Sequence, residues 1–280
     1  MAFEDHSIEQ KYDTLLFDVD DTLYPLSTGF SKECTKNIQE YMVQNLGIEE
    51  NKAYQLNQEL YRSYGTSMAG LKAIGYDFDN DDYHSYVHGR LPYDNLKPDH
   101  VLRSLLFSLP LRKVIFSNAD KVHVAKTLRK LGLEDCFERI ICFETLNPND
   151  NTNDNANNYE NDLKIGGHSC HFDFGSVLPK TPVLCKPSEE AFEHAIKLAN
   201  INPQRTVFFD DSIRNIQTGK QMGLTTVLVG KSNRVSGADY VLESIHNMKE
   251  ALPELWEATD NSKSTEYGTG KVAIETSVTA

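Results

Sequence analysis

The sequence has few cysteines, few basic residues and no long apolar run. Its five cysteines are an odd number and form no C-x-x-C pair, which disfavours a disulfide-rich extracellular fold. No apolar stretch approaches the ~20 residues that cross a bilayer, and residues 1–13 are too polar for a signal peptide. Acidic side chains outnumber basic ones by 41 to 28, so we expect no nucleic-acid polymer as a partner. We therefore expect a cytoplasmic protein, with nuclear presence left open, that does not attach to membranes.

What the sequence does contain is a series of short, uniformly apolar runs, each followed at once by polar residues. The three clearest runs are 14–17, 113–116 and 206–209, and further strands are predicted at 139–143, 225–229 and about 239–242. Runs of this kind are typical of strands buried in a parallel sheet. Ligands bind just beyond the carboxyl ends of such strands, so the polar residues there are the first candidates for a site.

Helical patterns alternate with these strands. The helix that ends at Gly132 is predicted to bury one apolar face: Val122, Ala125, Leu128 and Leu131. A second apolar face, over 191–199, follows a proline and a serine that suit the start of a helix. The alternation predicts an α/β fold with a Rossmann-like, doubly wound parallel sheet.

Residues 25–97 interrupt that alternation because they contain only helical patterns. Two apolar stripes, over 30–46 and 53–64, each end at a glycine. We therefore predict an all-helical cap domain, inserted after the first strand into a core formed by residues 1–24 and 98–256.

Two further segments have no apolar period at all. Residues 147–180 include a long run of asparagine and aspartate, and residues 257–280 are also polar. Such composition predicts a mobile polar loop within the core and a flexible tail. Deleting most of residues 149–162 is therefore predicted to leave folding and activity intact, because shortening a loop has a small entropic effect.

Residues 18–23, Asp-Val-Asp-Asp-Thr-Leu, resemble the D-x-D-x-T-L signature of haloacid dehalogenase-like hydrolases. Three further motifs of that family follow in its order, each at a predicted strand end or helix start: Ser117-Asn118, Lys186 and Asp210-Asp211. One short motif matches by chance, whereas the ordered set rarely does. The resemblance implies a phosphohydrolase with the core and cap described above.

The resemblance assigns a role to each of these side chains. Asp18 is the nucleophile that attacks phosphorus and forms an aspartyl-phosphate. Asp20 protonates the leaving oxygen and later activates water, and because dehalogenases lack this second aspartate its presence favours a phosphatase. Ser117 and Asn118 are expected to bind the phosphoryl oxygens, while Lys186 offsets the charge in catalysis and phosphate binding.

The resemblance also implies Mg²⁺ as cofactor. Its expected ligands are the side chain of Asp18, the backbone carbonyl of Asp20, and Asp210 or Asp211. Magnesium suits oxygen ligands from a few carboxylates together with water and substrate phosphate. A bound cation would keep Asp18 ionised and let it approach an anionic phosphate.

A closer resemblance extends over about residues 12–251. Four segments look like the pyrimidine 5'-nucleotidase branch, which includes proteins called suppressor-of-disruption-of-TFIIS-like: 23–25, 64–71, 88–93 and 209–216. This resemblance implies a small phosphate ester as the partner molecule, namely a nucleoside 5'-monophosphate, with pyrimidine nucleotides first.

Selectivity must then come from the cap, because the core motifs contact only the phosphate. Four cap residues offer an aromatic ring for stacking or polar groups for the edge of a base: Tyr64, Thr66, Ser67 and His88. An equally good reading of Tyr64 is that it completes the apolar stripe of its helix.

Two other functions stay open. The first is a phosphatase of another small metabolite, such as a sugar phosphate or a phosphorylated cofactor, which substrate profiling would separate. The second is a regulatory or binding protein without activity. The presence of all five motif residues argues against an inactive protein: Asp18, Asp20, Ser117, Lys186 and Asp210. The sequence does not define the oligomeric state.

Three weaker signals have structural readings. Lys52 and Lys72 lie in the cap, where phosphonatases place a Schiff-base lysine, but solvated surface lysines are expected. His84 and His88 are four residues apart and could bind zinc. The glutamate of H-E-x-x-H is absent, however, so packing or substrate contact is favoured. A cluster that resembles half of a metal site stands in the polar loop: His168, Cys170 and His171.

Overall fold

Six parallel strands form the centre of the fold in a computed structural model that describes residues 10–148 and 178–256. The strands are β1 (Thr14–Phe17), β2 (Arg112–Phe116), β3 (Arg139–Ile141), β4 (Thr206–Asp210), β5 (Thr225–Val229) and β6 (Tyr240–Leu242). Their order in the sheet is β3-β2-β1-β4-β5-β6, and every neighbouring pair is parallel. The predicted α/β fold with a parallel sheet is therefore confirmed, with small shifts at the strand ends.

The central strand β1 explains why chemistry gathers at one edge of the sheet. Phe17, its last residue, pairs in register with Ile115 of β2 and with Phe209 of β4. All four residues of β1 and all five of β4 are buried. The charged and polar groups of the candidate site therefore lie where these strands end, at residues 18, 117 and 210.

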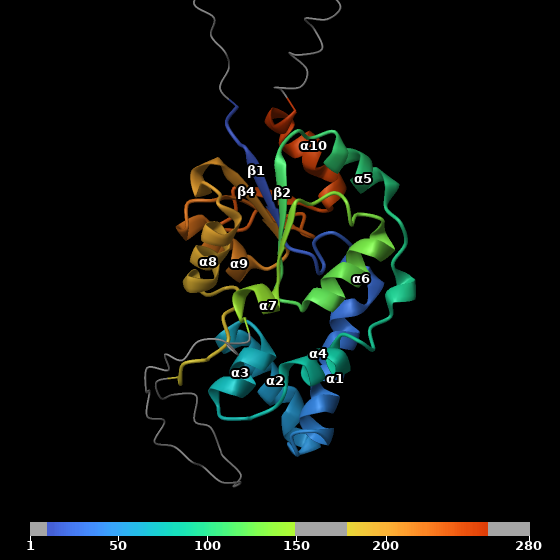
Figure 1. Ribbon diagram of the computed structural model, residues 1–280, viewed down its shortest axis with the longest axis vertical. Helices are drawn as coiled ribbons and strands as arrows, with labels where there is room; N and C mark the ends of the chain where they lie inside the picture. The colour runs from blue at the N-terminus through green and yellow to red at the C-terminus, as the bar shows by residue number, and fades with distance from the viewer. Residues whose placement is uncertain (1–9, 149–177, 257–280) are drawn as a thin grey trace, which may run out of the picture.

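Helices cover both faces of the sheet (Figure 1). One face carries α5 (His100–Phe107), α6 (Lys121–Leu131) and α10 (Met248–Ala251), and the other carries α8 (Glu189–Ala199) and α9 (Ile213–Gln221). Because side chains alternate along a strand, Leu15 and Phe17 join the first cluster and Leu16 the second. The short helix α7 (Phe143–Leu146) follows β3.

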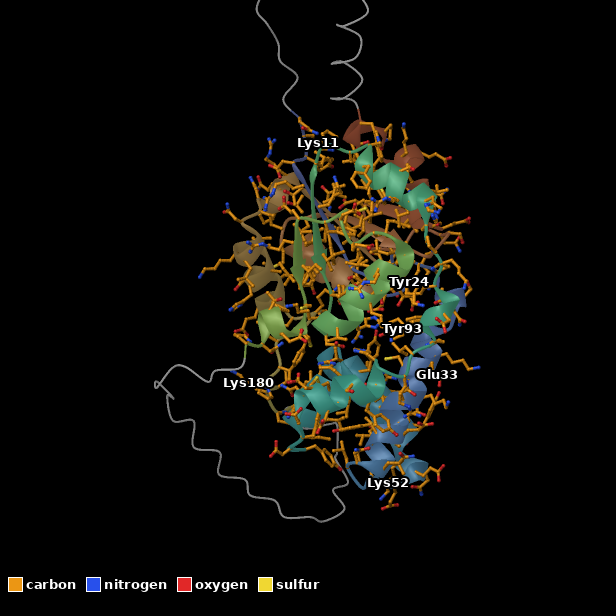
Figure 2. All side chains as sticks on the ribbon, turned by 45° about the vertical axis from the view of Figure 1, so that its right-hand side comes forward. Lys11, Tyr24, Glu33, Lys52, Tyr93 and Lys180 are labelled. Carbon is orange, nitrogen blue, oxygen red and sulfur yellow. The ribbon has the colours of Figure 1, made fainter. Side chains whose placement is uncertain are left out.

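A separate layer of four helices lies across the carboxyl end of the sheet (Figure 1). Its members are α1 (Phe30–Gln44), α2 (Glu50–Tyr64), α3 (Ser67–Ala73) and α4 (Asn80–Val87), here called the helical cap. They pack around their own buried cluster, which includes Met42, Leu60 and Leu71. Figure 2 shows Tyr24 and Tyr93 where this layer meets the core, and Lys52 at its far end.

The buried face of α6 differs from the predicted one. Val122 is 73% exposed and Ala125 is also exposed, whereas His123 and Thr127 are buried beside Leu128. The buried face therefore centres on Val124, Leu128 and Leu131, and it includes His123, whose hydrogen-bond partners are described below. In the cap, α1 ends at Gln44, a little before the end of the predicted stripe.

Several predictions lie outside the described residues. They concern most of the loop 147–180, the tail 257–280, and the cluster His168, Cys170 and His171. Among the helices of the described ranges, none combines the length and apolarity that a membrane crossing requires.

Candidate active site

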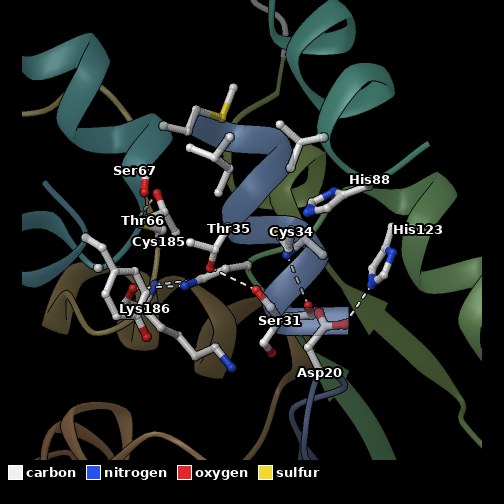
Figure 3. A pocket seen from close by; sticks show the side chains of 18 of the residues that line it. Asp20, Ser31, Cys34, Thr35, Thr66, Ser67, His88, His123, Cys185 and Lys186 are labelled. Carbon is white, nitrogen blue, oxygen red and sulfur yellow. Dashed lines mark hydrogen bonds and ion pairs between the residues drawn. The ribbon is translucent and has the colours of Figure 1, made fainter. Parts of the chain in front are cut away.

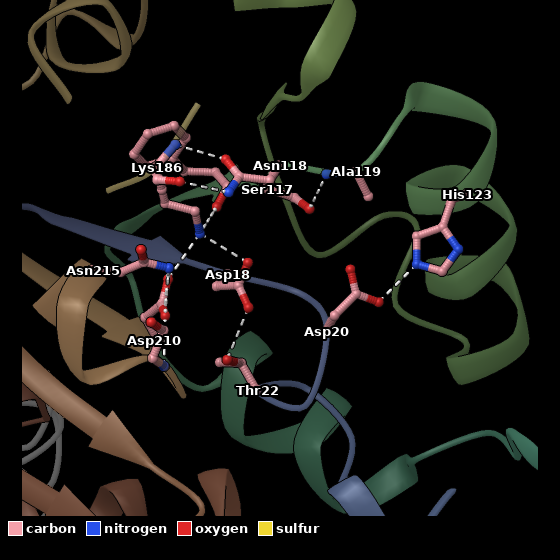
Figure 4. A network of polar contacts seen from close by, with 12 residues as sticks. Asp18, Asp20, Thr22, Ser117, Asn118, Ala119, His123, Lys186, Asp210 and Asn215 are labelled. Carbon is pink, nitrogen blue, oxygen red and sulfur yellow. Dashed lines mark hydrogen bonds and ion pairs between the residues drawn. The ribbon is translucent and has the colours of Figure 1, made fainter. Parts of the chain in front are cut away.

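Lys186 joins the ends of three strands. Its side chain is 1% exposed, and its Nζ donates to Asp18 Oδ1 at 2.8 Å, to Asp210 Oδ2 at 2.8 Å and to the Phe116 carbonyl at 2.7 Å (Figure 4). An ammonium group has three donors, so all are used. The carboxyl ends of β1, β4 and β2 are thereby fixed around one buried positive charge.

The carboxylates here carry more negative charge than Lys186 can balance. Burial raises the pKa of Asp18 to about 7, although the Lys186 ammonium opposes that rise. Burial, followed by the charges of Asp210 and Asp18, raises the pKa of Asp211 to about 9. Burial alone would lower the pKa of Lys186, but the two carboxylates beside it outweigh burial and raise it. The site therefore favours a further cation.

Asp18, Asp210 and Asp211 fit such a cation. One carboxylate oxygen from each lies within 4.8 Å of the others. A set made only of oxygen donors suits Mg²⁺ or another hard divalent cation. The side chain of Asp20 is not in this set, in line with the expectation that its backbone carbonyl is the ligand.

Neighbouring side chains hold these carboxylates in place. Thr22 Oγ1 donates to Asp18 Oδ2 at 3.0 Å, and Asn215 Nδ2 donates to Asp210 Oδ1 at 3.0 Å. The Ser212 backbone N–H also donates to Asp210 Oδ1, at 2.8 Å. Sequence reasoning missed Asn215 as a positioning residue, although it stands within a segment that resembles the nucleotidase branch.

Asp20 turns away from Lys186 and pairs with His123. Asp20 Oδ1 lies 2.7 Å from His123 Nε2 and also accepts from the Tyr24 hydroxyl (Figures 3 and 4). The side chain of His123 is 1% exposed, and its Nδ1 lies 2.8 Å from the Tyr93 hydroxyl. Burial raises the pKa of Asp20, but the charge and hydrogen bond of His123 outweigh it and lower the pKa to about 2. Conversely, burial lowers the pKa of His123 and Asp20 raises it, with a net rise.

His123 is a residue that sequence reasoning missed. The one signal in the sequence is Asp120, three residues earlier, which suits a helix N-cap. In the structure, Asp120 Oδ1 accepts from the His123 backbone N–H at 3.0 Å and begins α6. This cap sets the rotation of the first turn, so His123 points toward Asp20.

The two residues after β2 take different positions. Ser117 is buried at the cavity wall, where its Oγ accepts from the Ala119 backbone N–H at 3.0 Å. Both ends of the Asn118 amide contact the backbone of Lys186: Nδ2 donates to its carbonyl at 2.9 Å, and Oδ1 accepts from its N–H at 2.8 Å. Asn118 therefore positions Lys186, and a direct contact from it to phosphate remains an expectation.

A cavity of about 530 Å³ separates these strand ends from the helical cap. Thr66 and Ser67 line it from the cap (Figure 3). Tyr64 does not: its hydroxyl donates to the Pro179 carbonyl at 3.0 Å, which corrects the expectation that its ring faces the site. Tyr61, almost one turn earlier, is the tyrosine of α2 that lines the cavity instead.

Three of the cap groups already have partners. Thr66 Oγ1 caps α3 by accepting from the Ala69 N–H at 3.1 Å, and Ser67 Oγ donates to Asn57. His88 lines the cavity but is ion-paired with Asp120 of the core. Only part of the hydrogen-bonding capacity of Thr66 and Ser67 therefore remains for a ligand, and His88 faces the core.

The two cap lysines lie away from the cavity. Lys52 is exposed and pairs with Glu49 at 2.6 Å. Lys72 is not the solvated lysine that was predicted, because its Nζ donates to the Phe78 carbonyl and lies 4.2 Å from the centre of the Phe78 ring. Neither is placed for Schiff-base chemistry.

Comparison with known proteins agrees with this fold. The family model of haloacid dehalogenase-like hydrolases matches residues 151–223, whose described part contains Lys186, Asp210 and Asp211. In this match, in the order of its motifs and in its parallel sheet, the chain is similar to haloacid dehalogenase-like hydrolases.

A curated relative, Phosphate metabolism protein 8 of Saccharomyces cerevisiae, is 26% identical over 221 residues. The match covers 76% of this chain, and the chain spans 60% of that relative's length. Among solved structures, CbbY from Rhodobacter sphaeroides in complex with phosphate has the same fold. Its TM-score is 0.51 at 18% identity, over 87% of this chain and 99% of CbbY.

Proposed function

We propose that the chain is a magnesium-dependent phosphomonoesterase that works through a phosphoryl group carried on Asp18. The observation that supports this most directly is the position of Lys186, whose ammonium group bridges Asp18 and Asp210 at the cavity. Phosphoryl transfer needs a positioned nucleophile and neutralised charge more than it needs covalent help from other groups. A lysine that fixes the nucleophile beside a cation site suits both needs.

The proposed reaction has two steps. First, a carboxylate oxygen of Asp18 bonds to phosphorus while the bond from phosphorus to the ester oxygen breaks, and the leaving oxygen takes a proton through Asp20. Second, water attacks phosphorus, Asp20 accepts its proton, and the bond between phosphorus and Asp18 breaks. The Asp20–His123 pair can hold this proton between turnovers, after water has supplied it in the second step and before the next leaving oxygen takes it, since the pKa of His123 is raised and that of Asp20 lowered.

The metal-binding part of the proposal rests on Asp18, Asp210 and Asp211. These residues would hold Mg²⁺, which supplies positive charge to offset the phosphoryl oxygens. Lys186 keeps Asp18 and Asp210 in register, and the hydrogen bond from Thr22 fixes the second oxygen of Asp18. Ser117 lines the cavity wall, and its hydroxyl would contact a phosphoryl oxygen.

For the substrate we propose nucleoside 5'-monophosphates, pyrimidine nucleotides first. The cavity volume of about 530 Å³ falls within the ordinary range for small-molecule sites. Tyr61 offers an aromatic face at the cap side, and the free capacity of the Thr66 and Ser67 hydroxyls can bind the edge of a base. The substrate class otherwise rests on the resemblance to the pyrimidine 5'-nucleotidase branch.

The proposal is tested by metal depletion followed by substrate profiling. Activity on an aryl phosphate should stop after chelation and return with Mg²⁺ but not with Ca²⁺, whose larger and looser coordination misplaces the nucleophile. Undiminished turnover after thorough chelation would contradict the metal assignment. Uridine and cytidine 5'-monophosphates should then have higher kcat/KM than sugar phosphates. A higher kcat/KM for sugar phosphates than for these nucleotides would overturn the proposed substrate class. It would not contradict the proposed phosphatase mechanism.

A further inference from the structure

A second group of metal-binding side chains lies where the helical cap meets the core. His84 and His88 come from the end of α4, and Asp120 is the N-cap of α6. One ligand atom from each of the three lies within 4.8 Å of the others. The distance from His84 Nδ1 to Asp120 Oδ2 is 3.7 Å, and His88 Nδ1 is hydrogen-bonded to the same oxygen.

His84 is the member of this group that an ion pair alone does not explain. It is 6% exposed, and neither of its ring nitrogens has a hydrogen-bond partner in the described part of the chain. A buried polar atom without a partner costs about 1–3 kcal/mol and calls for an explanation, such as a bound ion. An imidazole nitrogen without a hydrogen-bond partner is free to bind a metal ion.

The donors match a transition metal better than magnesium. Two imidazole nitrogens and one carboxylate oxygen form a common three-ligand set for zinc, with a fourth position open. Zinc bonds of 2.0–2.2 Å in a tetrahedral arrangement place ligand atoms about 3.4 Å apart. His84 and Asp120 are 3.7 Å apart, close to this separation, whereas the 2.5 Å hydrogen bond between His88 and Asp120 would have to open when an ion binds. Asp120 is itself oriented, because its other oxygen accepts from the His123 backbone N–H. His84 and His88 line the cavity, which gives an ion a route in.

We propose that His84, His88 and Asp120 form a second metal site, separate from the carboxylate cluster, that binds Zn²⁺ or a similar divalent transition metal. Binding would replace the hydrogen bond between His88 and Asp120. The site would link α4 of the helical cap to the start of α6 in the core. Its occupancy would therefore fix the cap against the sheet, independently of whether the proposed phosphatase reaction is correct.

The test uses the full chain with competing sites removed. His168→Asn, Cys170→Ser and His171→Asn form the background, and excess Mg²⁺ occupies the carboxylate cluster. Titration with Zn²⁺ should then reveal one bound ion per chain and a higher midpoint of thermal unfolding. Co²⁺ should give the strong visible absorption of a four-coordinate ion, whereas six-coordinate cobalt on carboxylates absorbs weakly.

His84→Leu in that background is the decisive variant. It should lose the bound ion, the thermal shift and the cobalt absorption, with affinity reduced at least about tenfold. Without zinc it should be as stable as the background, because no unpaired polar atom remains. His194→Leu, which removes an exposed histidine of α8, should change none of these.

Two results would overturn the proposal. One is a background chain that binds no Zn²⁺ in excess Mg²⁺. The other is a folded His84→Leu chain that binds Zn²⁺ and Co²⁺ as the background does. If His84→Leu fails to fold, His88→Gln, which removes a more exposed ligand, must show the same losses. Retained binding in that variant also contradicts the site.

Discussion

The two walls of the cavity differ in how completely their polar side chains are paired. On the core wall, Lys186 uses all three of its donors, and Thr22 and Asn215 fix the carboxylates around it. On the cap wall, His84 has no hydrogen-bond partner within the described residues, and Tyr61 is 51% exposed. The groups around Lys186 are therefore organised before any ligand arrives. The cap wall keeps His84 and Tyr61 available, although Thr66, Ser67 and His88 already have partners.

This difference suggests different roles for the two walls: the core wall catalyses the reaction, and the cap wall selects the ligand. Groups that act on developing charge are effective when the fold holds them in advance, because no reorganisation is then needed during the reaction. Groups that choose among substrates or ions need unused bonding capacity instead. Changes in the core wall should therefore affect turnover of every substrate, and changes in the cap wall should affect which ligand is preferred.

The largest expected effect is at the nucleophile. Asp18→Asn keeps the shape of the side chain but removes the attacking oxyanion, so turnover of all phosphate esters should fall by on the order of 10⁴-fold or more. Steady-state kinetics, with circular dichroism as the check on folding, measures this. Asp94→Asn, at an exposed aspartate paired with Lys130, is the control and should keep full activity. A folded Asp18→Asn enzyme with wild-type rates would remove the basis of the account.

Next is the pairing of Asp20 with His123. His123→Asn should lower kcat for nucleotides roughly tenfold to a hundredfold, since a hydrogen bond to a charged group is worth about 1.5–3 kcal/mol. Aryl phosphates should be less affected, because their leaving group needs little proton transfer. His100→Asn, at an exposed histidine, is the control. Equal losses on both substrates would mean that His123 is only structural.

The contact between the walls gives the third prediction. A Cβ on Gly65 would lie 2.2 Å from the Lys186 carbonyl oxygen, and φ at Gly65 is +88°. Gly65→Ala should lower the free energy of unfolding by about 1–3 kcal/mol more than Gly75→Ala, which has φ of +94° but open space around it. Its kcat should fall too, since Lys186 must move. Denaturant unfolding of both variants decides this, and equal destabilisation would contradict the close contact.

On the cap wall, Tyr61 should affect selectivity and little else. Tyr61→Ala should lower kcat/KM for nucleotides about tenfold, because stacking of a base on an aromatic ring is worth about 1–3 kcal/mol. Hydrolysis of a small alkyl phosphate should be unchanged. Tyr54→Ala on the same helix is the matched control, since Tyr54 is exposed but outside the cavity. A similar loss on both substrates would place Tyr61 in folding instead of recognition.

The last expected effect concerns stability and not turnover: a dependence of stability on pH that only the metal-free protein has. Folding raises the pKa of Asp211 from 3.8 to about 9, so its contribution is fully present below pH 3.8 and is lost as pH rises through 9. Thermal unfolding in chelator should therefore show a midpoint that falls over this range. Adding Mg²⁺ should raise the unfolding midpoint by a few degrees, and the increase should be larger at high pH than at low pH. Asp211→Asn should flatten both trends, and an unchanged profile would contradict them.

The core wall could be predicted from the sequence for a physical reason. Asp18, Ser117 and Asp210 each end a short apolar strand, and strand ends in a parallel sheet meet at one edge. Lys186 precedes a helix whose stripe is visible at 191–199. Local pattern and motif therefore carried enough information to bring these groups together.

The cap wall and His123 could not be predicted in the same way. Periodicity placed Val122 and Ala125 inside because they are apolar, yet α6 turns His123 inward to meet Asp20, which is 103 positions away. Similarly, the sequence cannot tell which tyrosine of α2 faces a cavity, since that depends on how the helix packs on the sheet. Contacts with residues that are distant in the sequence determine which of these side chains point inward. A local sequence pattern therefore cannot predict them.

The central claim is tested most directly by trapping the phosphoryl group on the protein. Asp20→Asn should slow hydrolysis of the intermediate by ~10²–10⁴, while an aryl phosphate still reacts because its leaving group needs little protonation. Mixing this variant with Mg²⁺ and an aryl phosphate, quenching in acid and mapping peptides by mass spectrometry locates the label. The account predicts one phosphoryl group on the peptide that contains Asp18, and none in Asp18→Asn. A label on a different residue, or rapid turnover of Asp20→Asn without any label, would contradict it.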